Sequence, residues 1–303
     1  MIKKTLYFGN PMYLSCRNDQ LVMSVPHAKG IDHTLDNTVP IEDIGVVILD
    51  HSQITITQYL ISKLLENNVA LINCDETHLP KGLMLNLAGN TLQQTRFQAQ
   101  LEASVPLKKN LWQQTIQAKI RNQAAVLRRL GIDTDNMMYW MREVKSGDTE
   151  NHEARAAAYY WKNYLPANFQ FTRQRDGIAP NNLLNYAYAI LRAIVARALV
   201  ASGMLPTFGI FHRNQYNAYC LADDIMEPYR PFADWIIREW VMSGKPFIEL
   251  NKDIKRELLM LPTTDILIDD KRSPLMVGVQ RTTASLIACY EGSTRKIMYP
   301  EIP

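Results

Sequence analysis

The sequence predicts an α+β protein in which a small mixed-sheet domain precedes a larger helical domain. In about the first 75 residues, short runs rich in β-branched and aromatic side chains are separated by turn residues roughly every ten positions, which is typical of strands. From about Leu92 onward the hydrophobic period becomes helical, and long segments contain neither Gly nor Pro. The length of 303 residues favours two domains over one.

Strands are expected where apolar runs alternate with turn residues. Thr5–Phe8 is one such run. Tyr13–Arg17 and Gln20–Val25 flank Asn18-Asp19, a pair that tolerates the left-handed backbone of a tight hairpin. Two continuous apolar strands complete this region, at Gly45–Leu49 and Val69–Asn73. A short helix is expected between them, at Gln58–Glu66.

Helices are expected over most of the remaining chain. The segments with helical period are Gln93–Ser104, Leu107–Leu130, Glu153–Tyr164, Leu183–Ser202 and Asp234–Ser243. The stretch Asp75–Asn90 has the Pro and Gly content of an interdomain linker, so the domain boundary is placed near residue 90. The most apolar stretch, Leu183–Leu205, carries Arg192 and Arg197 and is therefore interpreted as a buried helix and not a membrane span.

The composition is that of an ordinary globular protein, with 47% hydrophobic and 21% charged residues. A net charge of +3 permits a nucleic-acid partner but lacks the strong basic signature of a dedicated DNA-binding domain. The scattered cysteines Cys16, Cys74, Cys220 and Cys289 fit reduced thiols better than a disulfide framework or a zinc ribbon. With no signal peptide recognisable at the start, we expect a cytoplasmic protein.

The strongest local signal for chemistry is His212, which precedes Glu227 by fifteen residues. The segment between them is polar and turn-like, so the two side chains can face each other across a loop. Asp224 and Glu227 share one face of a helix, which suits a hard cation with oxygen ligands. Pro228 should place Glu227 at an irregular backbone position. A structural alternative is a core or capping histidine beside an acidic pair that complements the helix dipole.

Glu153 is the second candidate, in the first turn of an Ala-rich helix. A carboxylate there is stabilised by the helix N-terminus whatever its function, and this is the structural alternative to catalysis. The small residues Ala156–Ala158 would let another helix or a nucleic-acid backbone approach closely. Glu150 and His152 precede the helix and are expected to be solvated, so Glu153 is preferred.

Three blocks carry a resemblance to a known family. They are Asn151-His-Glu153-Ala-Arg-Ala-Ala-Ala, Gly209-Ile-Phe-His212 and Ala222-Asp-Asp-Ile-Met-Glu227-Pro-Tyr-Arg230-Pro. In order and spacing they resemble the signatures of the CRISPR-associated spacer integrases, the Cas1 family, in the form found in type II systems. The segments Lys3–Phe8, Val39–Asp50 and Leu79–Leu83 resemble the N-terminal domain of that family. Ala154 departs from the pattern, because the family commonly has glycine there.

The resemblance implies a β-sandwich-like domain at residues 1–90 that forms a homodimer, and an all-helical catalytic domain at residues 91–303. It implies that Glu153, His212 and Glu227 are the metal ligands and catalytic residues of a DNA endonuclease and integrase. Asp224 matches a secondary acidic position beside the metal, and Asp223 has no counterpart. Two carboxylates and an imidazole suit Mg²⁺ or Mn²⁺, and the nitrogen ligand favours manganese.

The implied reaction is phosphoryl transfer, in which the 3′-hydroxyl of captured foreign DNA attacks a phosphodiester of the repeat array. Candidate phosphate contacts are Arg230, Arg238, Lys245, Lys252, Lys255 and Arg256, with Lys108, Lys109, Lys119 and Arg121 on the long central helix. The implied partners are double-stranded DNA, a Cas2 dimer bridging two homodimers, and type II accessory adaptation proteins. Two other functions stay open: a stand-alone metal-dependent DNA nuclease, and a non-catalytic nucleic-acid-binding scaffold.

Overall fold

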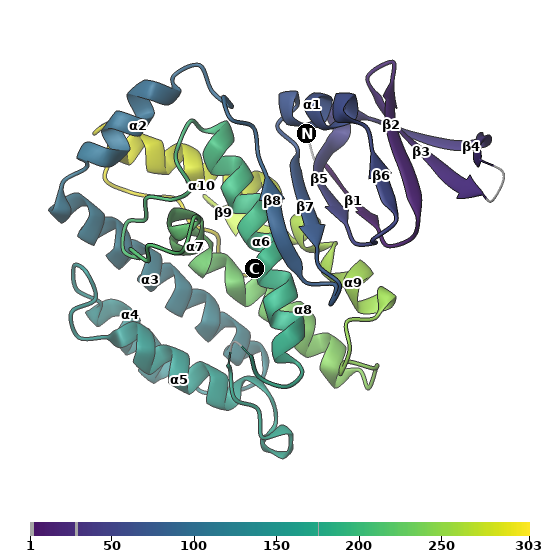
Figure 1. The fold of residues 1–303 in the computed structure, drawn as a ribbon. Coiled ribbons are helices and arrows are strands. Elements are labelled where there is room, and N and C mark those ends of the chain that lie inside the picture. Colours follow the sequence, from purple (N-terminus) through teal and green to yellow (C-terminus); the bar gives the residue numbers. More distant parts are fainter. Residues whose placement is uncertain (1–2, 28–29, 175) are drawn as a thin grey trace. The chain divides into compact units, whose positions relative to one another are not determined.

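The protein divides into two compact units, Met1–Thr91 and Leu92–Pro303. The structure is a computed structural model that describes residues 3–27, 30–174 and 176–303. The first unit contains two four-stranded sheets, and the second is mainly helical (Figure 1). The predicted α+β class, with strands first and helices after them, is confirmed.

The sheets of the first unit share one apolar core. Their strands are β1 (Lys4–Phe8), β2 (Met12–Arg17), β3 (Gln20–His27), β4 (Gly30–Pro40), β5 (Ile44–Leu49), β6 (Ile54–Ile56), β7 (Ala70–Cys74) and β8 (Pro80–Met84). One sheet has the order β1-β5-β7-β8 and the other β4-β3-β2-β6. Both sheets and helix α1 (Gln58–Glu66) contribute buried side chains to the core, including Leu14, Val47 and Leu60. This is the β-sandwich-like arrangement that was expected.

The hairpin between β2 and β3 forms where the turn residues predict it. Asn18 and Asp19 have φ values of 53° and 56°, and Arg17 pairs with Gln20 across the turn. Positive φ at both central residues gives a turn whose twist matches that of the flanking strands. The register then directs Leu14 and Leu21 into the core, where both are fully buried.

The predicted linker Asp75–Asn90 is wrong in part, because its middle is strand β8. This strand pairs antiparallel with β7. The side chain of Asp75 closes the connecting turn by accepting hydrogen bonds from the backbone N–H groups of Thr77 and Leu79, at 3.0 and 3.1 Å. Pro80 is tolerated because it opens a strand at the edge of the sheet, where its missing donor is not needed.

The second unit is built around the long helices α3 and α6. Its helices are α2 (Gln93–Glu102), α3 (Val105–Arg129), α4 (Asp135–Glu143), α5 (His152–Tyr164), α6 (Asn181–Ala201), α7 (Cys220–Met226), α8 (Arg230–Met242), α9 (Lys252–Leu258) and α10 (Leu275–Tyr290). Among the described residues, α6 is the one helix whose length and composition would allow it to cross a membrane. Its apolar window is 78% buried inside the structure, as in the core helix of a globular protein.

The second unit is not all-helical, because β9 (Asp265–Ile268) and β10 (Lys271–Pro274) form a hairpin. The hairpin packs against α10, a helix that was not predicted although Val279–Tyr290 contains neither Gly nor Pro. Gly278, in the first turn of α10, has a packing role: a Cβ there would lie 2.1 Å from Cδ1 of the buried Ile266. The glycine therefore allows close approach of helix and strand.

The last residues of the chain, for which the sequence indicated no role, form hydrogen bonds with α3. The hydroxyls of Tyr299 and Thr115 lie 2.8 Å apart, and Asn122 Nδ2 donates to the carbonyl oxygen of Pro300 at 3.0 Å. The same Asn122 amide donates to the carbonyl oxygen of Pro228 at 2.7 Å. One buried side chain of α3 is thereby tied to the C-terminal segment and to the turn after α7.

Gly278→Ala should destabilise the protein by about 1–3 kcal/mol, because an added methyl overpacks the contact with Ile266. Ile266→Val removes the Cδ1 atom nearest to the added methyl. The double variant should therefore be more stable than Gly278→Ala alone. Urea unfolding of the four proteins gives the coupling energy, and strictly additive losses would contradict this packing explanation.

Candidate active site

Glu227 lies at the point where one helix changes into another. Helix α7 ends at Met226, Glu227–Tyr229 form the 3₁₀ turn η3, and α8 begins at Arg230. The change of helix type coincides with Pro228, as the sequence predicts. The backbone of Glu227 itself is ordinary right-handed helix, with φ −51° and ψ −47°, so the expected irregular conformation is not found. The turn buries the glutamate to 4% exposure.

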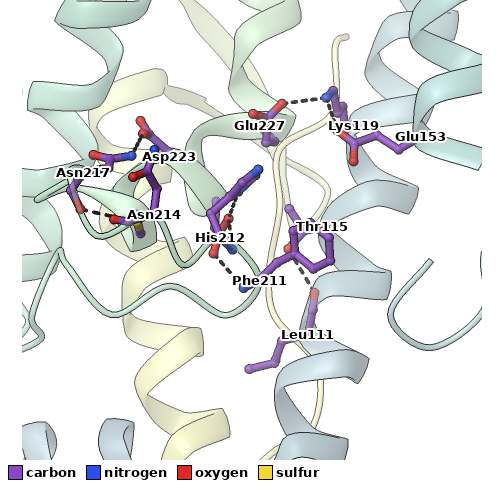
Figure 2. Close-up of polar contacts among 12 residues, drawn as sticks. Leu111, Thr115, Lys119, Glu153, Phe211, His212, Asn214, Asn217, Asp223 and Glu227 are labelled. Atoms are coloured by element: carbon purple, nitrogen blue, oxygen red, sulfur yellow. Dashed lines mark hydrogen bonds and ion pairs between the residues drawn. The ribbon is translucent and has the colours of Figure 1, made fainter. Parts of the chain in front are cut away.

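Lys119, from the middle of α3, lies between two carboxylates. Its Nζ donates to Glu153 Oε1 at 2.6 Å and lies 2.7 Å from Glu227 Oε2 (Figure 2). The contact between Lys119 Nζ and Glu227 Oε2 is an ion pair and not a hydrogen bond. Oε2 of Glu227 therefore has unused capacity to accept a hydrogen bond. The sequence analysis assigned Lys119 to phosphate binding. In the structure its side chain is 11% exposed and neutralises the acidic pair.

Arg230 supplies the second positive charge to Glu227. Its Nη2 lies 2.9 Å from Glu227 Oε1, and its guanidinium also stacks over the ring of Tyr188. Burial by itself raises the pKa of Glu227, but Arg230 and Lys119 outweigh it and hold that pKa below its usual value. Burial likewise works to lower the pKa of Lys119, and the two glutamates outweigh it and raise that pKa. Glu227 and Lys119 are therefore both charged at neutral pH.

Glu153 is positioned by the N-terminus of α5. Asp148 accepts the backbone N–H groups of His152 at 2.9 Å and of Glu153 at 3.0 Å, and so caps the helix. Asn151 adopts a left-handed backbone, with φ 55°, that turns the chain into the helix. Contrary to expectation His152 is not solvated: it is the first residue of α5 and only 2% exposed, whereas Glu150 remains on the surface.

His212 is held by Asp224 and not by the glutamates. Its Nδ1 lies 2.5 Å from Oδ1 of Asp224, whose side chain is fully buried. The backbone N–H of Phe211 donates to the other oxygen of Asp224 at 2.9 Å. With Nδ1 engaged by a carboxylate, Nε2 is the nitrogen left to bind a ligand, and the histidine side chain is 47% exposed.

The charge state of the His212–Asp224 pair follows from its surroundings. The hydrogen bond to Asp224 is the largest influence and raises the pKa of His212, to which Glu227 and Glu153 also contribute. Burial raises the pKa of Asp224, and the hydrogen bonds from His212 and Phe211 oppose it.

Asp223, which has no counterpart in the family pattern, anchors the far end of the loop between His212 and Tyr219. Arg192 donates to both of its oxygens, at 2.6 and 3.1 Å, and Asn217 Nδ2 donates to Oδ2 at 2.7 Å. The adjacent Asp224 holds His212. Two consecutive aspartates of α7 therefore fix both ends of the segment that carries the imidazole.

The predicted set of three metal ligands is brought to one region but not into one coordination sphere. Among the side chains of residues 3–26, 37–174 and 176–303, no three from His, Cys, Asp or Glu are grouped closely enough to hold a metal ion. The reason is geometric: the Lys119 ammonium lies between Glu153 and Glu227, and Asp224 holds His212 on the other side. The three side chains therefore form no tight cluster in this structure, and their assignment as metal ligands stays a prediction.

The basic residues predicted to contact phosphate differ in how far their side chains are buried. Lys255 is 3% exposed, and Arg238 donates to the carbonyl oxygen of Tyr164 at 2.8 Å. The side chains of Arg230 and Lys119 are partly buried, at 28% and 11% exposure, and both are paired with Glu227, so their assignment to phosphate binding stays a prediction. Four candidates lie on the surface with exposed side chains: Lys109, Lys245, Lys252 and Arg256.

Comparison with known proteins gives a family and a set of similar folds. The family model of the CRISPR associated protein Cas1 matches residues 6–247. The CRISPR-associated endonuclease Cas1 of Neisseria meningitidis serogroup C is 37% identical over 305 residues, covering 100% of this chain and 97% of the relative. A CRISPR-associated endonuclease Cas1 of Saccharolobus solfataricus is 30% identical over 188 residues, 58% of this chain and 57% of the relative.

Solved structures show the same fold at low identity. A casposase bound to integration product matches with a TM-score of 0.78 at 19% identity, covering 97% of this chain and 92% of that one. A Cas1 protein from Thermotoga maritima matches with a TM-score of 0.75 at 12% identity, covering 95% and 97%. A chain of a Cas6-RT-Cas1–Cas2 complex matches with a TM-score of 0.75 at 19% identity, covering 100% of this chain and 36% of that one.

The two-unit fold places the protein in the structural class that casposases share with Cas1 proteins. Within that class the matched family model and the full-length relative are decisive, and the chain belongs to the Cas1 family.

Lys119→Met should lower the free energy of unfolding by about 3 kcal/mol, because it leaves buried carboxylate charge without its cation. Chemical denaturation at pH 8 measures the loss. The loss should shrink as the pH falls toward 4.5, the ordinary pKa of a glutamic acid, because protonation removes the unpaired charge. Lys109→Met, on the exposed face of the same helix, should stay within about 0.5 kcal/mol of the parent. Equal losses in the two variants would contradict the assignment.

Asp224→Asn should lower the pKa of His212, because the carboxylate that raises it is gone. A histidine with a raised pKa adds stability that is fully present below its unfolded value of 6.5 and is lost as the pH rises through the folded value. The variant should lack this pH-dependent change in stability. NMR titration of the ring resonances checks the pKa, with Asp223→Asn as the control that leaves it in place. An unchanged His212 titration in Asp224→Asn would refute the pairing.

Proposed function

We propose that this protein is the integrase of CRISPR adaptation, a metal-dependent DNA endonuclease that joins the 3′-hydroxyl ends of captured foreign DNA to the repeat array by transesterification. The observation that carries the proposal is the convergence of Glu153 and Glu227, from separate elements, on one buried cationic group beside the exposed imidazole of His212. The endonuclease names of the relatives and the integration product in the casposase structure support the reaction class.

The donor set fits Mg²⁺ or Mn²⁺. The acidic pair already accommodates a positive charge, Glu227 Oε2 has unused acceptor capacity, and His212 offers Nε2. A carboxylate that engages the second ring nitrogen is the usual outer partner of a metal-binding histidine, and Asp224 has this place. Glu153, Glu227 and His212 would hold the ion, with Asp224 behind the imidazole. When bound, the ion supplies positive charge at the phosphoryl oxygen and favours ionisation of the attacking hydroxyl.

The remaining residues would orient these groups. Arg230 fixes Glu227 through Oε1 and leaves Oε2 facing Lys119, and Asp148 fixes the start of α5 below Glu153. In the reaction, the 3′-hydroxyl loses its proton and its oxygen forms a new bond to phosphorus. The phosphorus–oxygen bond to the leaving 3′-oxygen breaks, so the number of phosphodiester bonds is unchanged. Water in place of the hydroxyl would give endonuclease activity.

The proposed partners follow from the same family membership. We propose that the β-rich unit forms the homodimer and that the helical unit binds double-stranded DNA, with a Cas2 dimer bridging two homodimers and type II accessory proteins assisting. The Cas1–Cas2 complex among the similar structures supports the Cas2 partner. Lys245, Lys252 and Arg256 remain the candidate phosphate contacts, because their side chains are exposed.

Glu227→Gln and His212→Ala should each abolish transfer of a labelled DNA fragment into a supercoiled plasmid that bears the repeat. The loss should exceed the 10- to 100-fold that removal of an outer partner of a metal ligand typically costs. Glu257→Gln, a surface carboxylate on α9, is the matched control and should retain full transfer. Normal transfer by both site variants would favour a scaffold function.

The same assay separates integration from hydrolysis. A fragment whose 3′-end carries no hydroxyl should not be joined by the wild-type protein, because the attacking group is missing. Equal cleavage of the plasmid with both fragments, together with no joining of the fragment that carries its hydroxyl, would indicate a stand-alone nuclease. Size-exclusion chromatography of each variant checks that its oligomeric state is unchanged.

A further inference from the structure

An aromatic pair borders the candidate active site. The rings of Phe211 and Trp112 are stacked face to face, with centroids 4.3 Å apart and an interplanar angle of 1°. Trp112 is buried in α3, whereas Phe211 is 47% exposed. The His212 ring stands edge-on to both, with its centroid 5.6 Å from that of Trp112 and 5.3 Å from that of Phe211. An exposed flat apolar ring therefore lies directly beside the imidazole.

This exposed ring is held in place by the groups that hold the site. Asp224 accepts the backbone N–H of Phe211 at 2.9 Å and engages the ring of His212 with its other oxygen. Gly209 lets the loop approach α7, since a Cβ at this position would lie 2.7 Å from Asp224 Oδ2. A ring fixed by stacking and by its backbone loses little conformational freedom when a ligand binds to it.

A basic residue neighbours each side of the aromatic pair along the chain. Lys108 is one turn before Trp112 on α3, so both residues lie on the same side of the helix. Arg213 lies two residues after Phe211, next to His212 in the loop, and its side chain is exposed. Burial lowers the pKa of Lys108, and the positive charge of Arg213 acts in the same direction. Within the described part of the chain, no carboxylate forms an ion pair with either.

We propose that Phe211, backed by Trp112, stacks the last base of a single-stranded DNA 3′-end, while Lys108 and Arg213 bind a phosphate of the same strand. The proposal rests on the proposed function and names the residues that would place the reacting end beside His212. Aromatic side chains stack any base, because every base has a π-face, and a pair of like charges without acidic partners suits a phosphate.

The position of the Phe211 ring is not explained by surface exposure alone, as a comparison with Tyr216 shows. Tyr216 of the same loop is 88% exposed, but no stacking partner is found for it among the described residues. Phe211 combines exposure, a buried stacking partner and proximity to the imidazole. Tyr216 therefore provides a matched control, as an exposed aromatic residue of the same loop outside the stacked pair.

The test uses a DNA duplex with a single-stranded 3′-end whose last base is 2-aminopurine, which loses fluorescence when it stacks. The full-length protein is added with EDTA, so that no strand transfer occurs, and fluorescence anisotropy reports binding separately. Wild-type protein should quench the terminal base. Phe211→Leu, which keeps an apolar contact with Trp112, should quench little and bind about tenfold more weakly. Phe211→Tyr should restore quenching, and Tyr216→Leu should behave as wild type.

Two further measurements separate stacking from folding and from charge. With a DNA end that lacks its terminal base, wild type and Phe211→Leu should bind equally, because there is nothing to stack. Arg213→Gln should reduce the slope of log affinity against log salt by about 0.7, the value for one phosphate contact on a single strand, and Phe211→Leu should leave the slope unchanged. Circular dichroism melting confirms that each variant is folded.

The outcomes distinguish this proposal from the function on which it rests. Binding with equal quenching by wild type and Phe211→Leu would overturn the stacking subsite and leave the integrase proposal standing. A tenfold loss that persists on the DNA without its terminal base would also overturn it, since the effect would then be structural. Absence of any binding to DNA ends would contradict the proposed function, and the subsite with it.

Discussion

The buried ammonium group of Lys119 is the interaction on which the candidate site depends. Glu153 and Glu227 come from the start of α5 and from the turn after α7, and their negative charges would repel each other without a cation between them. Lys119 can supply that charge only because α3 is held in register, through the contacts of Asn122 and Thr115 with the C-terminal segment and with Pro228. Packing of α3 against the C-terminal segment and the turn after α7 therefore helps to set the separation of the carboxylates.

A second constraint is the pair of consecutive aspartates on α7. Asp224 organises His212 and Phe211, and Asp223 organises Asn217. Because adjacent residues of a helix point in different directions, the two carboxylates reach opposite ends of one loop. The imidazole and the exposed aromatic ring are thus fixed before any ligand arrives, which limits the conformational entropy lost on binding.

The sequence predicted the class of fold better than it predicted the contacts of the candidate site residues. Apolar period and turn residues located the β2–β3 hairpin and helix α1, because these depend on local chemistry. Helix α10 was missed although Val279–Tyr290 contains neither Gly nor Pro, and the contact of Gly278 with Ile266 is a tertiary one that local pattern cannot reveal. Lys119 was misassigned because a lysine on a long helix is usually solvated. Its place three residues after the buried Ile116 was the available signal for a paired internal charge.

The central claim is that the acidic pair, now neutralised by Lys119, is the cation site of the enzyme. Its most direct test is the anomalous diffraction of a crystal grown with Mn²⁺, recorded at the manganese absorption edge. The account predicts a peak between the carboxylates of Glu153 and Glu227, within bonding distance of His212 Nε2, with the Lys119 ammonium displaced from between the two glutamates. A crystal in which Lys119 still bridges the glutamates, while the manganese peak lies elsewhere, would contradict it.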